Sequence, residues 1–181
     1  TCPEGYFARP GVALVEGGPL IGGTCDLCVA PCESCLSAQE CKTCKGGTYL
    51  NPHDFGCRFQ CPENTYMNGT GDVGRTCAYC PPPSYGCLNA TYALSCRGDN
   101  YYLTPDHSCE PECPEGYYKS EGIPEYEGGP MIGGTCAECV DNCLTCYSAA
   151  HCTSCRNGAY LNNRTEKCDF SCPEGEYMFG E

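Results

Sequence analysis

The amino-acid sequence predicts a tandem array of small, disulfide-rich modules, built of irregular β-hairpins with little or no helix and forming an elongated rod. Cysteine supplies 23 of the 181 residues, a density typical of disulfide scaffolds. The spacing of these cysteines repeats along the chain. With 23 Gly, 15 Pro and no Trp, the chain cannot bury one large core, so cross-links must replace core burial.

One run of cysteines defines the repeat. From Cys25 to Cys61 the spacing is C-x2-C-x3-C-x2-C-x5-C-x2-C-x12-C-x3-C, followed directly by Pro-Glu. The same spacing returns from Cys136 to Cys172, so the two copies are 111 residues apart. The segment EGGPLIGGTC of the first copy returns as EGGPMIGGTC in the second. The chain therefore contains an internal repeat.

A second, shorter step of 52 residues lies inside this repeat. It places most cysteines of the first copy on cysteines between Cys77 and Cys113, but Cys32 falls on Ser84 and Cys41 falls on Ala93. The predicted domains are residues 1–60 as a long module, residues 61–112 as a short module with one disulfide fewer, residues 113–171 as a long module, and residues 172–181 as the start of a further module.

The two cysteines that the short module lacks indicate how the disulfides connect. A bonded pair is lost together, because the loss of one partner would leave an unpaired thiol. Cys32 and Cys41 are therefore predicted to bond each other, as are Cys143 and Cys152. The other predicted bridges are Cys2–Cys25, Cys28–Cys35, Cys44–Cys57, Cys61–Cys77, Cys80–Cys87, Cys96–Cys109, Cys113–Cys136, Cys139–Cys146 and Cys155–Cys168.

One cysteine remains after this assignment. Eleven bridges use 22 cysteines and leave Cys172 unpaired in this segment. We expect its partner farther along a longer protein, at the spacing of the first loops; a free thiol and an inter-chain bond are the alternatives. No signal peptide and no apolar run of about 18 residues is present, so a signal and any membrane anchor are expected elsewhere in that protein.

Short strands are expected where turn residues flank aromatic and aliphatic ones. Residues 48–50, 100–102 and 159–161 fit this pattern, and each would form a hairpin closed by its own disulfide. An aromatic residue also stands five positions after the first cysteine of each module, where we expect its ring to pack against disulfides between modules. These residues are Phe7, Tyr66, Tyr118 and Tyr177.

The composition predicts an extracellular or cell-surface location and a secreted protein. Disulfides at this density need an oxidising compartment. Three N-x-[ST] triplets are candidate N-glycosylation sites, at Asn68, Asn89 and Asn163. The formal net charge of −13 argues against nucleic acid and against an anionic membrane surface as partners. No membrane contact is expected within this segment.

The run CxxCxxxCxxCxxxxxCxxC, followed by GGTYL or NGAYL and then CxxxCPE, resembles the furin-like cysteine-rich repeat. That repeat occurs in growth-factor receptor ectodomains, proprotein convertases, R-spondins and many protist surface proteins. The resemblance implies irregular hairpin modules stacked into a rod, with overlapping disulfides as inferred above. In R-spondins a loop between two cysteines binds the receptor through paired phenylalanines; the matching loops here, residues 36–40 and 147–151, lack them. Long and short modules that alternate look more like a protist or algal surface or fibre protein.

Other chemistry fits the residues less well. Closely spaced C-x2-C pairs suit disulfides better than zinc, and a redox C-x2-C motif would need a βαβ unit that is not predicted here. His53, His107 and His151 are interpreted as solvated loop residues, and the acidic residues 121–127 as a solvated face rather than a calcium site. We therefore predict no catalytic, cofactor-binding or metal-binding residue, no cofactor and no enzyme activity in this segment.

The function predicted from the sequence is that of an extracellular structural glycoprotein, a rod, stalk or filament of tandem repeats. Its expected partners are further copies of itself or other extracellular proteins, together with N-linked glycans. The alternative is the ligand-binding ectodomain of a receptor or a protist surface antigen. In that case the loops that differ between the two long modules, residues 7–15 and 118–126, would form the recognition surface.

Overall fold

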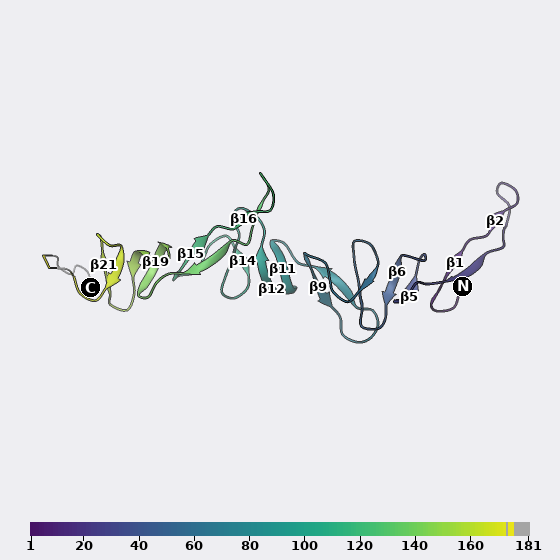
Figure 1. The fold of residues 1–181 in the computed structure, drawn as a ribbon, viewed down its shortest axis with the longest axis horizontal. Coiled ribbons are helices and arrows are strands. Elements are labelled where there is room, and N and C mark those ends of the chain that lie inside the picture. Colours follow the sequence, from purple (N-terminus) through teal and green to yellow (C-terminus); the bar gives the residue numbers. More distant parts are fainter. Residues whose placement is uncertain (173, 176–181) are drawn as a thin grey trace. The chain divides into compact units, whose positions relative to one another are not determined.

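Small β-sheets make up all of the regular secondary structure that the described residues contain. The structure is a computed structural model that describes residues 1–172, 174 and 175. Within this part every regular element is a strand, and the sheets have two to four strands (Figure 1). The predicted fold class of disulfide-rich hairpins without helix is confirmed. The chain divides into two compact units, Thr1–Cys80 and Pro81–Glu181.

The first unit contains three two-stranded sheets and one four-stranded sheet. The pairs are β1–β4, β2–β3 and β5–β6, and the larger sheet has the order β8-β7-β10-β9. Every pair is antiparallel except β7 with β10, which is parallel. The bounds are β1 Tyr6–Arg9, β2 Val12–Ala13, β3 Leu20–Ile21, β4 Thr24–Leu27, β5 Cys32–Cys35, β6 Cys41–Cys44, β7 Tyr49–Leu50, β8 Cys57–Arg58, β9 Thr65–Asn68 and β10 Thr76–Tyr79.

The second unit has the same kinds of sheet. Its two-stranded sheets are β11–β12, β16–β17, β19–β20 and β21–β22, and its four-stranded sheet has the order β14-β13-β18-β15. The bounds are β11 Ser84–Asn89, β12 Tyr92–Cys96, β13 Tyr102–Leu103, β14 Cys109–Glu110, β15 Tyr117–Ser120, β16 Ile123–Pro124, β17 Met131–Ile132, β18 Thr135–Glu138, β19 Cys143–Ser148, β20 His151–Cys155, β21 Tyr160–Asn162 and β22 Lys167–Asp169.

Each four-stranded sheet joins the last hairpin of one predicted module to the first strands of the next. In the first unit, Leu50 of β7 lies opposite Thr76 of β10, and the Leu50 N–H donates to the Arg75 carbonyl at 2.9 Å. In the second unit, Leu103 of β13 lies opposite Thr135 of β18 in the same parallel arrangement. We call these two sheets the junction sheets.

In each junction sheet a cation lies over the tyrosine of the strand that forms the parallel pair from the preceding module, β7 or β13. The Arg75 guanidinium lies 5.4 Å from the centre of the Tyr49 ring, and the Lys119 ammonium lies 5.6 Å from the centre of the Tyr102 ring. In both cases the tyrosine belongs to the terminal hairpin of one predicted module and the cation to the beginning of the next. The cation–π contact adds to the main-chain hydrogen bonds that join the two.

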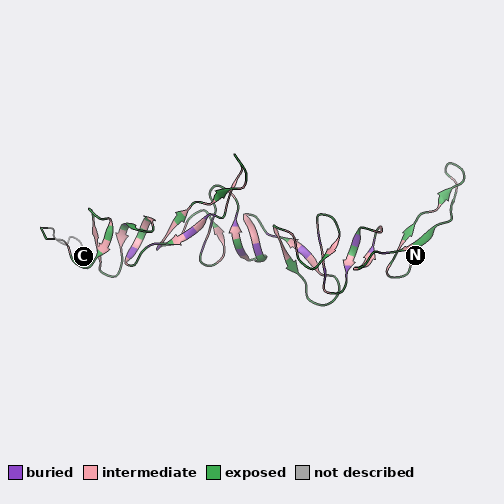
Figure 2. Cartoon of the chain, viewed as in Figure 1, coloured by how far each residue is buried: buried purple, intermediate pink, exposed green. Residues whose placement is uncertain are grey.

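Sulfur atoms take the place of a conventional apolar core. Among the described residues, the buried apolar positions are cysteines with the exceptions of Ala93 and Tyr102. Figure 2 shows the buried positions as short stretches of strand separated by exposed loops. Because each sulfur cluster lies within one hairpin and its neighbours, the packing is local, as in repeat proteins.

The aromatic residues expected between modules occupy different environments. Phe7 packs against the buried cluster of Cys28, Cys32, Cys35 and Cys41, which lies within its own predicted module. The reason is that β1 pairs with β4 and places Phe7 opposite Asp26, two residues before this cluster begins. Tyr66 and Tyr118 are half-buried, and Tyr177 lies outside the described residues.

All three expected hairpin strands begin within their predicted segments, and the strand near residue 100 begins latest. Strands β7 and β21 start one residue after the predicted start, at Tyr49 and Tyr160, and β13 starts two residues after it, at Tyr102. The turn ahead of it closes with a hydrogen bond from the Tyr101 N–H to the Gly98 carbonyl. Gly98 has a φ of +122°, a conformation that glycine adopts without steric cost, and the strand cannot start before this turn ends.

The double substitution Cys32→Ser with Cys41→Ala gives the β5–β6 hairpin the residues that the short module has at these positions. We expect the protein to fold with its other disulfides unchanged. The free energy of unfolding of the first unit should fall by about 2–3 kcal/mol, the contribution of a disulfide that closes a loop of this size. Disulfide mapping and denaturant unfolding measure the two effects.

The single substitution Cys32→Ser is the matched control for this experiment. It leaves the Cys41 thiol, which is only 4% exposed, without a partner, and should therefore yield mixed disulfides. Scrambled disulfides in the double variant would contradict the expectation that this bridge is independent of its neighbours.

Candidate functional site

The predicted disulfide cysteines are the first set of candidate residues, and the structure brings them together in pairs. The Cα atoms of ten pairs lie 5.3–6.0 Å apart, within the usual range for disulfides. Cys80 and Cys87 are each disulfide-bonded as well. The ten pairs are Cys2–Cys25, Cys28–Cys35, Cys32–Cys41, Cys44–Cys57, Cys61–Cys77, Cys96–Cys109, Cys113–Cys136, Cys139–Cys146, Cys143–Cys152 and Cys155–Cys168.

The short module fills the place of the missing bridge with two small side chains. In the long module Cys35 lies opposite Cys41 across the β5–β6 hairpin. In the short module Cys87 lies opposite Ala93, whose side chain is only 3% exposed. The Ser84 hydroxyl lies 3.9 Å from the Cys109 sulfur. The hairpin therefore keeps its shape and its packing without this cross-link.

Clusters of sulfur atoms occur in both long modules, at Cys32, Cys41 and Cys57 and at Cys143, Cys152 and Cys168. A metal would need these cysteines as thiolates. All six are instead bonded as disulfides. These clusters are therefore the crowded centres of the disulfide scaffold and not metal sites.

Cys172 is a free, half-buried cysteine at the edge of the described residues. The sequence predicts a partner for it farther along a longer protein, and that prediction stands beside the alternatives of a free thiol and an inter-chain bond.

The three glycosylation candidates lie at the ends of strands. Asn68 ends β9, Asn89 ends β11, and Asn163 follows directly after β21. All three asparagines are exposed. The Asn89 side-chain oxygen accepts hydrogen bonds from the Thr91 N–H at 2.8 Å and the Thr91 hydroxyl at 3.0 Å, so this triplet forms a turn at the surface.

The loop at residues 147–151 carries a cluster of polar and aromatic side chains. The Tyr147 and His151 rings stack at 5.3 Å, and the Tyr147 hydroxyl donates a hydrogen bond to the Glu166 carboxylate. This hydrogen bond, with a smaller effect of the carboxylate charge, raises the pKa of Tyr147 above its usual value of 10.0. The matching loop at residues 36–40 begins with Leu36, which is 61% exposed, and has no such cluster.

Two of the three histidines are exposed, as the interpretation drawn from the sequence expects, and His107 departs from it. His107 is half-buried and stacks on Tyr92 at 3.9 Å, and His53 meets the edge of Tyr79 at 5.4 Å. Together with His151 on Tyr147, each histidine therefore lies against a tyrosine. The sequence carried no signal for these contacts, because the partners are 4 to 26 residues apart. Tyr147 and His151 lie on the paired strands β19 and β20, whereas His53 and His107 lie in turns that meet a tyrosine of another hairpin.

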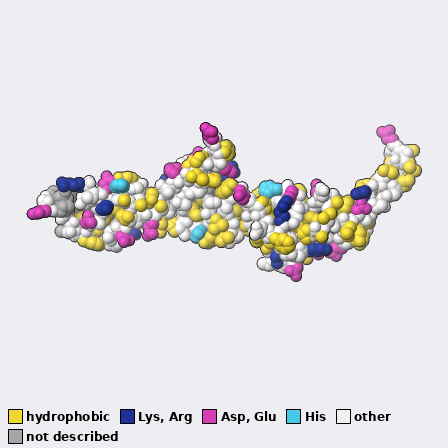
Figure 3. All heavy atoms as spheres, in the orientation of Figure 1, with side chains coloured by type: hydrophobic (Ala, Val, Ile, Leu, Met, Phe, Trp, Pro, Cys, Tyr) yellow, Lys and Arg dark blue, Asp and Glu magenta, His cyan; other side chains and the backbone are white. Residues whose placement is uncertain are grey.

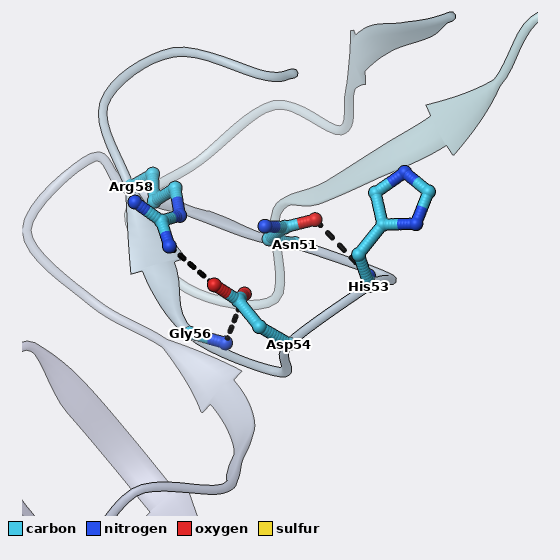
Figure 4. A network of polar contacts seen from close by, with 5 residues as sticks. All are labelled: Asn51, His53, Asp54, Gly56 and Arg58. Atoms are coloured by element: carbon cyan, nitrogen blue, oxygen red, sulfur yellow. Dashed lines mark hydrogen bonds and ion pairs between the residues drawn. The ribbon is translucent and has the colours of Figure 1, made fainter. Parts of the chain in front are cut away.

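A small polar network shapes the turn between β7 and β8 (Figure 4). The Asp54 carboxylate accepts hydrogen bonds from the Arg58 guanidinium and from the Gly56 N–H, and the His53 N–H donates to the Asn51 side-chain oxygen at 3.1 Å. The hydrogen bond from Arg58 lowers the pKa of Asp54 below its usual value of 3.8. Each of these bonds closes the turn itself, so the network has a structural role.

Curated relatives of this chain are modular cysteine-rich proteins. Cysteine repeat modular protein 2 of Tetrahymena thermophila is 30% identical over 97% of this chain, which corresponds to 10% of that protein. Proprotein convertase subtilisin/kexin type 5 of Mus musculus is 29% identical over 85% of the chain and 8% of its own length. The extracellular matrix organizing protein FRAS1 of Homo sapiens is 32% identical over 47% of the chain and 2% of its length. No family model matches the chain, and no solved structure is significantly similar to it.

The hairpins, the disulfides and these relatives define the class of the protein. It is an extracellular cysteine-rich repeat protein, since disulfides at this density form and persist in oxidising compartments. More particularly, the chain belongs to the furin-like cysteine-rich repeat family. The chain spans a tenth or less of the length of each curated relative named above, and in the convertases it matches the cysteine-rich, non-catalytic region.

In the part of the chain that the structure describes, no helix is long and apolar enough to cross a bilayer.

The substitution Glu166→Gln should lower the pKa of Tyr147 toward 10, because it removes the carboxylate that favours the protonated phenol. The folded pKa is raised, so this contact stabilises the loop below pH 10 and the stabilisation is lost as the pH rises through the folded pKa. An NMR titration of the Tyr147 ring measures the effect. Glu110→Gln is the control and should leave the Tyr147 titration unchanged; an unchanged titration in Glu166→Gln as well would contradict the assignment.

Asn68, Asn89 and Asn163 are predicted to carry N-linked glycans when the protein is secreted from a eukaryotic cell. Enzymatic removal of the glycans should then lower the mass of the intact protein, and the triple substitution of these asparagines by Gln should abolish that loss. Asn100 is a suitable control because it is exposed but has no Ser or Thr two residues later. Glycan-free peptides at all three sites would disprove the prediction.

Proposed function

We propose that this segment serves as an extracellular structural glycoprotein, a non-catalytic rod, stalk or filament built from stacked long and short modules. The observation that carries this proposal is the recurrence of the junction sheet. Leu50 pairs with Thr76 and Leu103 pairs with Thr135 in the same parallel register. A joint that forms twice between different neighbours can be repeated along a longer chain.

The proposed modules are those predicted from the sequence, with boundaries at residues 60, 112 and 171. Each long module has its own disulfides and its own cluster of buried sulfur atoms, within residues 28–41 in the first and residues 139–152 in the second. Stability of this kind does not depend on a core shared by the whole chain. An object of any length can therefore be built by adding modules, which suits a stalk or a filament.

A secreted, cell-surface or matrix location fits the proposed role. The relative FRAS1 is named as an extracellular matrix organizing protein, and the three surface asparagines suit a glycoprotein. The proposed partners are further copies of the same protein or other extracellular proteins. A net charge of −13 keeps such a surface soluble and disfavours nucleic acid.

Electron microscopy of the full-length protein, isolated from its natural source without reduction, tests this proposal. Ordered fibres or stalks with an axial repeat are the expected result, and a sample treated with a disulfide reductant should lose them. Unassembled protein that instead binds a soluble ligand tightly as a monomer would overturn the structural role and favour the ligand-binding ectodomain.

A further inference from the structure

The first loop of each long module forms a protruding hairpin of the same geometry. In the first copy, residues 11–23, β2 pairs with β3 and Val12 lies opposite Ile21. In the second copy, residues 122–134, β16 pairs with β17 and Ile123 lies opposite Ile132. Gly22 and Gly133 have nearly the same positive φ, +74° and +76°. We call these segments the first and second loop hairpins.

The second loop hairpin is fastened to the short module that precedes it. The Gly98 N–H donates to the Met131 carbonyl at 2.8 Å, and the Gly133 N–H donates to the Cys96 carbonyl at 3.0 Å. The Met131 N–H donates to the Asp99 side chain at 3.1 Å. At the end of the hairpin, the Leu103 N–H donates to the Gly134 carbonyl at 2.8 Å. The contact is therefore made mainly by the backbone.

The first loop hairpin has the same backbone groups but is uncovered. Within the described residues, β3 pairs only with β2, and β4 pairs only with β1. Leu20 is 64% exposed and Ile21 is 47% exposed, whereas their counterparts Met131 and Ile132 are half-buried. Figure 2 shows the strands of this hairpin as exposed, and Figure 3 shows apolar side chains gathered on it.

The space around Gly23, compared with that around the matching Gly134, indicates which kind of module would fit against the first loop hairpin. At the matching Gly134, a Cβ atom would lie 2.9 Å from the Tyr101 carbonyl oxygen of the short module, so a side chain is excluded there. A Cβ atom on Gly23 would approach its neighbours no closer than 3.4 Å, and the φ of Gly23 is not positive. The first hairpin itself therefore does not require glycine at this position.

The junction from a long to a short module has different requirements at this position. There the matching residue is Arg75, whose carbonyl accepts from Leu50 and whose side chain covers Tyr49. A large side chain is thus accommodated at this position when the preceding module is a long one. Glycine is needed at this position when the preceding module is a short one, because its longer turn places Tyr101 against the backbone.

We propose that the first loop hairpin, together with the outer edge of β4, is the docking surface for a module of the short type, like residues 61–112. The terminal hairpin of that module would pair in parallel with β4, as β13 pairs with β18. Its carbonyl at the position of Cys96 would accept a hydrogen bond from the Gly22 N–H. Because the hairpin already has the bound geometry, docking requires little ordering of the backbone.

A second copy of this chain does not offer the same partner. Its own short module already binds its own second loop hairpin through Cys96, Gly98 and Leu103. The ion pair between Arg97 and Glu125, at 2.7 Å, has no counterpart in the first hairpin, where Leu14 replaces Glu125. The proposed docking therefore depends on backbone hydrogen bonds and apolar contact, and it holds whether the protein is structural or binds a ligand.

The test compares the 181-residue chain with an extended chain in which a second copy of residues 61–111 precedes Thr1. Thr1 then stands where Glu112 stands before Cys113. Amide hydrogen exchange followed by NMR reports on Gly22 and Leu20, the counterparts of Gly133 and Met131. In the extended chain the exchange of both amides should slow at least about tenfold, a change of about 1.4 kcal/mol in opening free energy. Gly133 provides the internal reference.

Gly23→Ala supplies the matched variant. In the 181-residue chain it should leave the disulfides and the exchange of neighbouring amides unchanged, because its Cβ has room. In the extended chain it should return Gly22 to fast exchange, just as Gly134→Ala should accelerate Gly133 in either chain. An extended chain that duplicates residues 1–111 provides a second version in which the added short module keeps its own predecessor.

Two outcomes would overturn the proposal. One is fast exchange of Gly22 in an extended chain whose added disulfides map correctly. The other is protection of Gly22 that grows with the concentration of the 181-residue chain alone, which would make a second copy the occupant.

Discussion

The disulfides are the constraint on which the rest of this structure depends. A chain with so few large apolar side chains cannot compensate the loss of conformational entropy by core burial. Short covalent loops reduce that loss instead, because they restrict the unfolded chain. Cys44 and Cys143 are fully buried, so the sulfur atoms also supply the apolar contacts of the interior. As a result each hairpin is stabilised locally, and one bridge can be replaced by Ser84 and Ala93 without loss of the hairpin.

Local stabilisation leaves the joints between modules to the backbone. In both junction sheets a leucine N–H donates to a carbonyl of the following module, although that carbonyl belongs to Arg75 in one case and to Gly134 in the other. The same main-chain pairing forms at both junctions, so long and short modules can follow each other, with a glycine required where Gly134 meets Tyr101. The side chains then adjust the fit, through Arg75 on Tyr49 and Lys119 on Tyr102. The exposed loops and asparagines remain available for partners and glycans.

The sequence predicted the features that depend on spacing along the chain. The joint absence of two cysteines from the short module led to the Cys32–Cys41 pair, which the structure also contains. Features that depend on how turns close were less accessible. The strand at Tyr102 starts later than predicted because the turn at Gly98 is longer, and Phe7 packs within its own module because β1 pairs with β4. The contact of each histidine with a tyrosine depends on how strands and neighbouring turns meet in space, for which the sequence held no signal.

The sequence by itself determined the class of the protein, the repeat of 111 residues and the predicted lengths of its modules. These are properties of cysteine spacing, and short disulfide loops translate spacing directly into structure. Only the tertiary structure decided which surfaces are covered. The loop hairpins at residues 11–23 and 122–134 are closely similar in sequence, yet Gly134 is buried and Gly23 is exposed. Burial depends on the neighbour that each hairpin meets, and a neighbour is a property of the assembled chain rather than of the segment.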